Sequence, residues 1–293
     1  MYINKRRILR AIVYRFARFI PNDRRYLEIL FPLRTGYPLN LEHPKTFNEK
    51  LQWLKLYNRR PEYTKMVDKV EAKKYVADII GEEYIIPTLA VYDRAEDIDF
   101  EALPNQFVLK CTHDSGSILI CKDKAKLNRH SVIKKLNNGL KKNYFYQKRE
   151  WPYKDVKPRI IAEKYLTDDG NELKDYKVFS FGGEPKFIEV DYNRFCGHKR
   201  NIYNTAWELL NFSIQYPSDS KRIIEKPPKI EEILWLSKKL SVGIPHIRID
   251  FYIVNNQVFF GELTFFHESG MGIFSPIEWD LRFGELILLP GIG

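Results

Sequence analysis

The stretch HIRIDFYIVNNQVFFGELT, residues 246–264, decides the fold because it predicts a β-hairpin with a charged face. Apolar and polar residues alternate over 246–254 and again over 257–264, as they do in strands with one buried face. The turn residues Asn255 and Asn256 lie between the two runs, and asparagine tolerates the backbone angles that a two-residue hairpin turn requires. The stretch therefore predicts two antiparallel strands in direct sequence.

Both strands carry charged or polar residues at alternate positions. Arg248 and Asp250 share one face of the first strand, and Glu262 and Thr264 share one face of the second. Simple pairing around the turn places Asp250 opposite Gly261 and beside Glu262. Neighbouring carboxylates repel each other unless a cation compensates them, and Mg²⁺ accepts two such ligands together with substrate phosphates and water. The hairpin therefore predicts a Mg²⁺ site. The alternative is a structural ion pair between Arg248 and the carboxylates on an exposed sheet face.

A second group of candidate binding residues surrounds a short polar loop. The apolar segments 106–110 and 118–121 predict two strands, and residues 112–117 between them predict a tight loop. A lysine at a strand end, followed by small residues with free backbone N–H groups, is one way in which proteins bind phosphate. We therefore expect Lys110 to face phosphates and to have no buried partner when no ligand is present. The loop has one glycine, Gly116, and is not a Walker A motif, so an ordinary hairpin turn is the alternative.

A third group follows at residues 163–166, Glu-Lys-Tyr-Leu, which end a β-rich stretch. An extended edge with free backbone groups can hydrogen-bond an adenine, and a nearby carboxylate such as Glu172 or Asp175 can bind the ribose hydroxyls. A turn is expected at 168–171. The order of the three groups, anion loop, edge strand and carboxylate hairpin, is more informative than any one residue.

The remaining pattern predicts an α+β chain without repeats or low-complexity segments. Helices are expected after the N-cap Thr46, over 67–80, within 122–150 and over 230–240; strands are expected over 84–92, 159–166, 176–181 and 186–191; residues 192–228 are expected to be irregular.

Composition and charge limit the class of protein. The 293 residues are 44% hydrophobic, which is typical of a globular chain with a real core. Three cysteines without close pairing favour a reducing compartment, and no apolar run is long enough to span a bilayer or to form a secretory leader. We therefore expect a cytoplasmic protein. The formal net charge of +10 predicts an anionic partner without identifying it.

Much of the positive charge lies in residues 1–25, where arginines and lysines alternate with isoleucine, leucine, valine and phenylalanine. This pattern predicts a basic amphipathic helix. One interpretation is that the helix docks on an anionic membrane, which would place the protein at the inner face of the membrane. The other is an ordinary helix whose apolar stripe packs on the domain.

Several separate motifs, in this order, resemble those of the TupA-like ATP-grasp family. The resemblance covers the chain from about residue 30 to the C-terminus. The motifs are FNEKLQW at 47–53, Asp68-Lys69, FVLKC at 107–111, IAEKYL at 161–166, Asp175-Tyr176-Lys177, Arg248-Ile249-Asp250 and Gly261-Glu262-Leu263-Thr264.

The resemblance implies an α+β ATP-grasp fold, in which two α+β lobes close over ATP, with an N-terminal helical extension. The expected divisions are a basic, amphipathic extension at 1–60, an N-lobe at 61–158 and a C-lobe with the metal-binding hairpin at 159–293. It also implies a ligase that activates a carboxylate as an acyl phosphate for attack by an amine. Members of the family are associated with teichuronopeptide and capsule-type polysaccharides and are often described as glycosyltransferases.

The resemblance also assigns roles to individual residues, with ATP and Mg²⁺ as cofactors. Lys69 and Lys110 are expected to hold the α- and β-phosphates; His113, Ser115, Gly116 and Ser117 to close over them; Glu163, Lys164, Leu166 and Asp175 to hold the nucleoside; Asp250, Glu262 and Thr264 to bind Mg²⁺; and Arg248 and Lys177 to act in catalysis. The chain differs from the family pattern in having Asp114 where glycine is usual and Thr264 where asparagine is frequent.

Two other function classes are open. A glycosyltransferase would need an Asp-x-Asp metal motif, and Asp97-Ile98-Asp99 is the only instance, in a segment that turn and capping residues also explain. A non-catalytic polysaccharide- or membrane-binding protein is the other class, but it does not explain why two carboxylates lie together on the hairpin. The expected partners are ATP and a glycan or amino-acid substrate, and no nucleic acid. His113 and His267 either line the site or are ordinary loop histidines.

Overall fold

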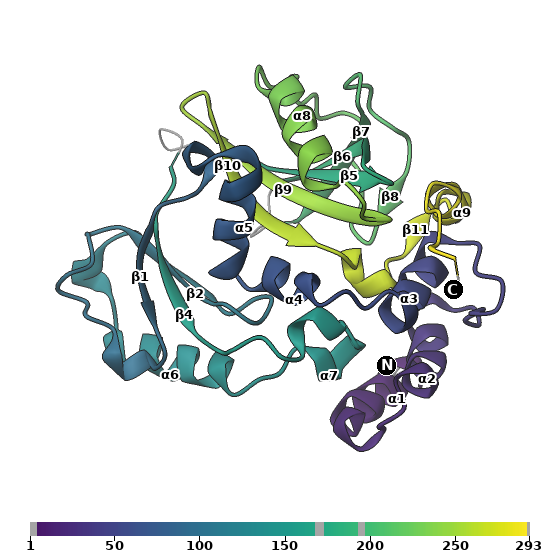
Figure 1. Ribbon diagram of the computed structural model, residues 1–293, viewed down its shortest axis with the longest axis horizontal. Helices are drawn as coiled ribbons and strands as arrows, with labels where there is room; N and C mark the ends of the chain where they lie inside the picture. Colours follow the sequence, from purple (N-terminus) through teal and green to yellow (C-terminus); the bar gives the residue numbers. More distant parts are fainter. Residues whose placement is uncertain (1–4, 168–172, 193–196, 292–293) are drawn as a thin grey trace.

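The computed structural model describes residues 5–167, 173–192 and 197–291, and it contains two main β-sheets joined and flanked by helices (Figure 1). The helices are α1 (Lys5–Arg15), α2 (Asp23–Thr35), α3 (Phe47–Tyr57), α4 (Glu62–Val67), α5 (Glu71–Ile80), α6 (Arg129–Leu140), α7 (Phe145–Lys148), α8 (Ile230–Leu240) and α9 (Glu278–Glu285). The strands are β1 (Thr88–Tyr92), β2 (Phe107–Cys111), β3 (Ile118–Cys121), β4 (Ile160–Lys164), β5 (Asp175–Phe181), β6 (Glu184–Tyr192), β7 (Lys199–Asn204), β8 (Ser213–Ile214), β9 (His246–Val254), β10 (Gln257–Thr264) and β11 (Phe274–Ser275).

The first sheet has the strand order β1-β4-β2-β3, and all of its pairs are antiparallel. Alternate residues of β2 differ in character: Phe107 and Leu109 are fully buried against α6, whereas Lys110 points to the opposite face. Helix α6 contributes Val132 and Leu136 to this small core. The first lobe therefore presents one polar face toward the rest of the molecule.

The second sheet has the order β10-β9-β5-β6-β7 and forms the larger lobe. One face is apolar, with Ile249 of β9 and Val178 of β5 packed in the same core as Leu236 of α8. The other face carries charged residues, and helices α4 and α5 lie between it and the first sheet (Figure 1). The alternation predicted for residues 246–264 thus separates a core from a polar surface.

Helix α3 is anchored at one end of the second sheet, although it precedes both sheets in sequence. Its N-cap Thr46 and Glu49 form a capping box. The buried carboxylate of Asp280 in α9 accepts hydrogen bonds from the backbone N–H of Asn48 at 2.9 Å and from its side chain at 2.8 Å. A carboxylate at a helix N-terminus is favourable for both hydrogen bonding and charge. The capping of α3 therefore joins it directly to α9.

Several predicted elements are confirmed, and three differ. The two hairpin strands and α8 have the predicted bounds. The helix expected over 67–80 is broken at Asp68, whose carboxylate accepts from the Val70 N–H and from Arg159. The strand expected over 84–92 begins after Pro87. The segment 192–228, expected to be irregular, contains β7, which is too polar to be predicted as a strand, and the two-residue strand β8. The turn expected at 168–171 and Glu172 lie outside the described residues.

The first 25 residues do not form one helix. Helix α1 ends at Arg15, a short 3₁₀ helix follows at Ala17–Phe19, and α2 begins after Asn22. Pro21 cannot donate a backbone hydrogen bond, and the Asn22 side chain caps α2 by accepting from the Arg25 N–H. No helix within the described residues is both long enough and apolar enough to cross a membrane.

The lobe boundaries differ from those expected. The strand at Ile160–Lys164 was assigned to the C-lobe, but β4 pairs with β1 and β2 in the first sheet. The helix α3, assigned to the N-terminal extension, contributes Phe47 and Leu51 to the core of the second lobe. The chain therefore crosses from the first lobe to the second after β4.

The close contact between α9 and the start of α3 yields a test of this packing. A Cβ atom on Gly284 would lie 2.1 Å from the Lys45 carbonyl oxygen, so Gly284→Ala should force the two helices apart and lower the free energy of unfolding by about 3 kcal/mol. Gly291 has open space around its Cα, and Gly291→Ala is the matched control. Denaturant unfolding measures both variants. Equal stability of the two would show that α9 does not pack on α3 in this way.

Candidate functional site

A cavity of about 260 Å³ lies between the two sheets and is lined by residues from both lobes. The predicted site residues that line it are Lys69, Lys110, Ser115, Gly116, Ser117, Glu163, Asp175, Lys177, Asp250 and Glu262. These residues come from widely separated segments, so the fold brings the three predicted groups together at one place.

The other predicted residues do not line the cavity. His113 is buried and its Nε2 lies 3.0 Å from the Lys142 carbonyl oxygen, as in an ordinary loop histidine. The Lys164 side chain is exposed, and Leu166 is also outside the cavity lining. Arg248 and Thr264 contact the lining residues Asp250 and Glu262 from behind.

One wall of the cavity carries three lysines around a buried carboxylate. The ammonium groups of Lys110 and Lys73 lie 2.6 and 2.5 Å from the carboxylate oxygens of Glu163. Burial opposes the ionisation of Glu163, but these two lysines outweigh it and lower its pKa. The third lysine, Lys69, donates to the Asp114 backbone carbonyl, and burial lowers its pKa. The expectation that Lys110 has no buried partner is therefore wrong, because Glu163 neutralises it.

The loop at 114–117 closes this wall. Asp114 is buried, and its carboxylate accepts a hydrogen bond from the Ser117 hydroxyl. Gly116 has a φ of 106°, a left-handed conformation that favours glycine. The Asp114 carboxylate is thus hydrogen-bonded within its own loop.

The opposite wall is the charged hairpin, and its register differs from the predicted one. Pairing follows the expected alignment from the turn to Phe260, and then a β-bulge at Gly261 shifts it by one residue. Asp250 consequently lies directly opposite Glu262. A Cβ atom on Gly261 would lie 3.0 Å from the Asp250 carbonyl oxygen, which explains why glycine occupies the bulge. The bulge brings the two carboxylates closer together than the sequence implied.

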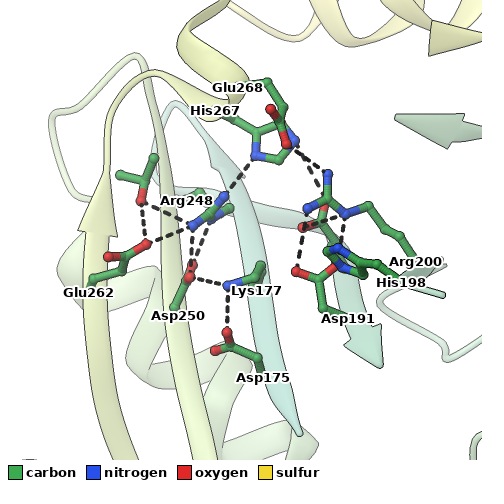
Figure 2. A network of polar contacts seen from close by, with 12 residues as sticks. Asp175, Lys177, Asp191, His198, Arg200, Arg248, Asp250, Glu262, His267 and Glu268 are labelled. Carbon is green, nitrogen blue, oxygen red and sulfur yellow. Dashed lines mark hydrogen bonds and ion pairs between the residues drawn. The ribbon is translucent and has the colours of Figure 1, made fainter. Parts of the chain in front are cut away.

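Arg248 and Lys177 compensate these carboxylates (Figure 2). Arg248 donates two hydrogen bonds to Asp250, at 2.7 and 2.8 Å, and one to Glu262 at 2.9 Å. The Lys177 ammonium lies between Asp250, at 2.5 Å, and Asp175, at 2.7 Å. Three carboxylates, Asp175, Asp250 and Glu262, thus meet two cations on this wall of the cavity.

Glu262 is the carboxylate that remains accessible. Its side chain is 46% exposed, whereas that of Asp250 is 2% exposed. Partial burial opposes its ionisation, but Arg248, Lys177 and Lys69 lower the pKa of Glu262, so it is a carboxylate at neutral pH. Thr264 accepts from Arg248 at 3.2 Å. Among the described residues, no group of three or more His, Cys, Asp or Glu side chains converges on one metal position. Two facing carboxylates nevertheless fit Mg²⁺, which completes its shell with phosphate and water oxygens.

The charged row continues across the sheet to a second cluster (Figure 2). The Arg200 guanidinium on β7 lies 2.8 Å from Asp191, 3.1 Å from Glu189 and 3.1 Å from Glu268. Burial raises the pKa of Glu189 to about 7, although Arg200 opposes the shift. Sequence reasoning missed Arg200 because β7 lies in a segment expected to be irregular.

His267 connects the two clusters. Its Nδ1 lies 2.8 Å from Arg248 Nη1, and its Nε2 lies 3.6 Å from a Glu189 oxygen. Burial and the adjacent Arg248 place the pKa of His267 well below the usual range. The neutral ring therefore accepts from Arg248 through Nδ1, which places its proton on Nε2, toward Glu189. His267 orients the arginine and does not line the cavity.

The turn that carries His267 is held from α3. Glu268, Ser269 and Gly270 have φ values of 47°, 58° and 60°, a conformation that is unfavourable for the two residues with a Cβ atom. Gln52 donates to the carbonyls of Ser269 and Gly270, and Lys55 donates to that of Ser269 at 2.7 Å. These buried α3 side chains therefore hold the left-handed turn in place.

Sequence reasoning also missed cavity residues that carry no recognisable motif. Lys73, in α5, follows Lys69 by four residues, and this spacing within the predicted helix was its only signal. Tyr153, Tyr252 and Phe260 supply aromatic lining. Nothing in the local sequence distinguishes them from core aromatics.

The Asp97-Ile98-Asp99 segment lies in a turn of the first lobe and away from the cavity. Asp99 accepts from the backbone N–H groups of Glu101 and Ala102 at 3.0 and 3.1 Å. Asp99 is therefore a turn residue, which agrees with the turn interpretation.

Comparison with known proteins gives a family match over most of the chain. The family described as TupA-like ATPgrasp matches residues 49–288. No curated protein matches.

The chain is also similar to several solved structures, all at low identity. A D-alanine–D-alanine ligase from Bacillus anthracis complexed with ATP is 17% identical, with a TM-score of 0.40, over 68% of this chain and 53% of that one. A D-alanine–D-alanine ligase from Helicobacter pylori is 18% identical, with a TM-score of 0.45, over 83% and 69%. A RimK domain protein ATP-grasp from Sphaerobacter thermophilus DSM 20745 is 11% identical, with a TM-score of 0.44, over 79% and 70%. The chain thus spans about half the length of the first of these.

The ion pair between Lys110 and Glu163 predicts that substitutions at these two residues have coupled effects on the free energy of unfolding. Lys110→Ala removes one of the two cations at the buried Glu163 and should lower the free energy of unfolding by about 2 kcal/mol. The double variant Lys110→Ala/Glu163→Gln should lose less than the sum of the single variants, because the two sites are coupled. Lys74→Ala is the control, since its partner Asp78 is exposed and such pairs contribute about 0.5 kcal/mol. Additive losses in the double variant would contradict the ion pair.

Proposed function

Because the chain belongs to the TupA-like ATP-grasp family and has its α+β fold, we propose that it is an ATP- and Mg²⁺-dependent carboxylate–amine ligase. One observation carries the proposal: the lysine wall and the carboxylate hairpin, which are far apart in sequence, face each other across a single cavity. A triphosphate needs cations on one side and a metal site on the other. This cavity offers both.

The lysine wall is the proposed phosphate site. Lys69 and Lys110 supply positive charge for the α- and β-phosphates, and the backbone and hydroxyl groups of 115–117 supply donors. Glu163 keeps Lys110 and Lys73 in place before nucleotide binds, which limits the reorganisation that binding requires. The backbone at 164–166 is the proposed adenine edge, and Asp175 is the proposed partner of the nucleoside.

The hairpin wall is the proposed metal site. Asp250 and Glu262 would hold Mg²⁺, with Thr264 as a neutral hydroxyl beside them. When bound, Mg²⁺ would neutralise the negative charge that develops on the transferring phosphoryl group. Lys177 lines the cavity beside Asp250, so it lies where it can stabilise the γ-phosphate and the carboxylate substrate. Arg248 contacts the same carboxylate from outside the cavity lining and would turn toward the γ-phosphate when nucleotide binds.

The proposed reaction has two steps. A substrate carboxylate oxygen attacks the γ-phosphorus, the bond to the β-phosphate oxygen breaks, and an acyl phosphate and ADP form. An amine then attacks the acyl carbon, phosphate leaves, the amine loses a proton, and an amide remains. Closure of the lobes would exclude water, which otherwise hydrolyses the acyl phosphate.

The proposed setting is the biosynthesis of cell-surface polysaccharide, in which the protein acts in the cytoplasm. Its substrate would be a glycan or an amino acid. The net charge of +10 suits an acidic polymer or precursor. The two described cysteines, Cys111 and Cys121, are buried and free, which is compatible with a reducing compartment.

Binding of Mg²⁺ by Asp250 and Glu262 can be tested without measuring catalysis. ATP with Mg²⁺ should raise the melting temperature of the wild-type chain, since a ligand at a hundred times its Kd stabilises by about 2.7 kcal/mol. Asp250→Asn and Glu262→Gln should abolish the Mg²⁺-dependent part of this shift. Glu278→Gln, on the exposed surface of α9, is the control. Full Mg²⁺-dependent stabilisation in both site variants would show that the carboxylates only pair with Arg248.

The reaction class can be tested by trapping. With ATP, Mg²⁺, hydroxylamine and a pool of amino acids and uronic-acid oligosaccharides, the enzyme should form a hydroxamate from its acyl phosphate and release one ADP for each. Glu262→Gln should form neither product. Stabilisation by UDP-sugars, with no ADP release in any pool, would instead support a glycosyltransferase.

A further inference from the structure

Helix α1 carries a second apolar face that no part of the described chain covers. Val13 and Tyr14 pack on the small core formed with α2, and α1 has no fully buried residue. Ile8 and Ile12, at i and i+4, project from the opposite side, and Leu9 lies beside them toward Val13; the three are 46%, 48% and 48% exposed in the order Ile8, Leu9 and Ile12. The apolar face therefore points into solvent.

The exposed face continues beyond the end of the helix. Phe16 is 50% exposed and Phe19 is 79% exposed, and their ring centroids lie 6.3 Å apart. Together with Ile8, Leu9 and Ile12 they form a contiguous set of large apolar side chains, here called the α1 apolar face. Soluble proteins rarely expose such a set unless it binds something.

The charge around this face is of one sign. Residues 5–22 contain one lysine and five arginines and no aspartate or glutamate. Two of these, Lys5 and Arg15, flank the α1 apolar face along the helix. A second copy of the chain would bring the same positive charge and would be repelled, and a nucleic acid would not require the exposed isoleucines and phenylalanines.

We propose that the α1 apolar face docks the protein on an anionic lipid bilayer. The helix lies in the interface plane, Phe16 and Phe19 enter the headgroup–acyl boundary, and the basic residues contact anionic headgroups. Apolar side chains in the centre and basic ones at the edge are the arrangement that such a surface requires.

The position of α1 leaves the cavity accessible. Helices α1 and α2 project from the end of the molecule where α3 and α9 lie, away from the first sheet (Figure 1). No residue of α1 or α2 lines the cavity. Docking through α1 therefore leaves the cavity open, and it places the cavity near substrates that are held at the membrane.

Cosedimentation of the full chain with vesicles tests the proposal. The wild-type chain should pellet with vesicles of phosphatidylcholine and phosphatidylglycerol, and not with phosphatidylcholine alone. The triple variant Ile8→Gln/Ile12→Gln/Phe19→Gln should lose binding with an unchanged melting temperature, because these side chains are exposed. The triple variant Lys5→Gln/Arg7→Gln/Arg15→Gln should bind about a hundredfold more weakly.

Two matched controls change similar residues elsewhere on the surface. Ile223→Gln/Val242→Gln/Leu288→Gln removes three exposed apolar side chains, and Lys126→Gln/Lys134→Gln/Lys221→Gln removes three charges. Both should bind vesicles like the wild type. The proposal is overturned if the apolar α1 variant still binds, if both charge variants weaken binding equally, or if the apolar α1 variant melts at a clearly lower temperature. ATP-Mg²⁺ stabilisation, measured in parallel, reports on the cavity independently.

Discussion

The arrangement of the second lobe depends on the burial of charge beside Asp250. This carboxylate is almost fully buried, and such a group is costly unless cations and hydrogen bonds compensate it. Arg248 and Lys177 supply both from neighbouring positions of β9 and β5. Because these side chains share one face of the sheet, the opposite face is left entirely to the core. The bulge at Gly261 then places Glu262 directly across from Asp250, so a half-exposed carboxylate lies beside a buried one.

The same constraint explains features that lie far from the hairpin in sequence. Arg248 has its orientation because the neutral His267 accepts an N–H of its Nη1, and His267 is placed by a left-handed turn. That turn is unfavourable by itself and is stabilised by buried donors from α3, namely Gln52 and Lys55. Helix α3 is in turn capped by Asp280 of α9. A helix near the start of the chain thus becomes part of the support of the candidate site.

The sequence predicted those parts of the fold that local periodicity determines. The hairpin, α8 and the capped start of α3 follow from alternation, helix spacing and a capping box, and they were predicted with their bounds or close to them. The candidate site residues that were predicted are lysines and carboxylates within recognisable motifs, and most of these residues line the cavity. Local sequence pattern could not predict features that depend on tertiary structure. These are the bulge that changes the register at Gly261, the Glu163 partner of Lys110, the pairing of β4 with the first sheet, and the strand that carries Arg200.

A structure of the protein with Mg²⁺ and a non-hydrolysable ATP analogue would show directly whether the cavity binds the nucleotide. We expect a triphosphate between the lysine wall and the hairpin, with Mg²⁺ at ~2.1 Å from oxygens of both Asp250 and Glu262. We also expect Arg248 to release Glu262 and to turn toward the γ-phosphate while His267 stays in place. A nucleotide bound outside the cavity, or one bound within it while Arg248 still bridges two metal-free carboxylates, would contradict the account.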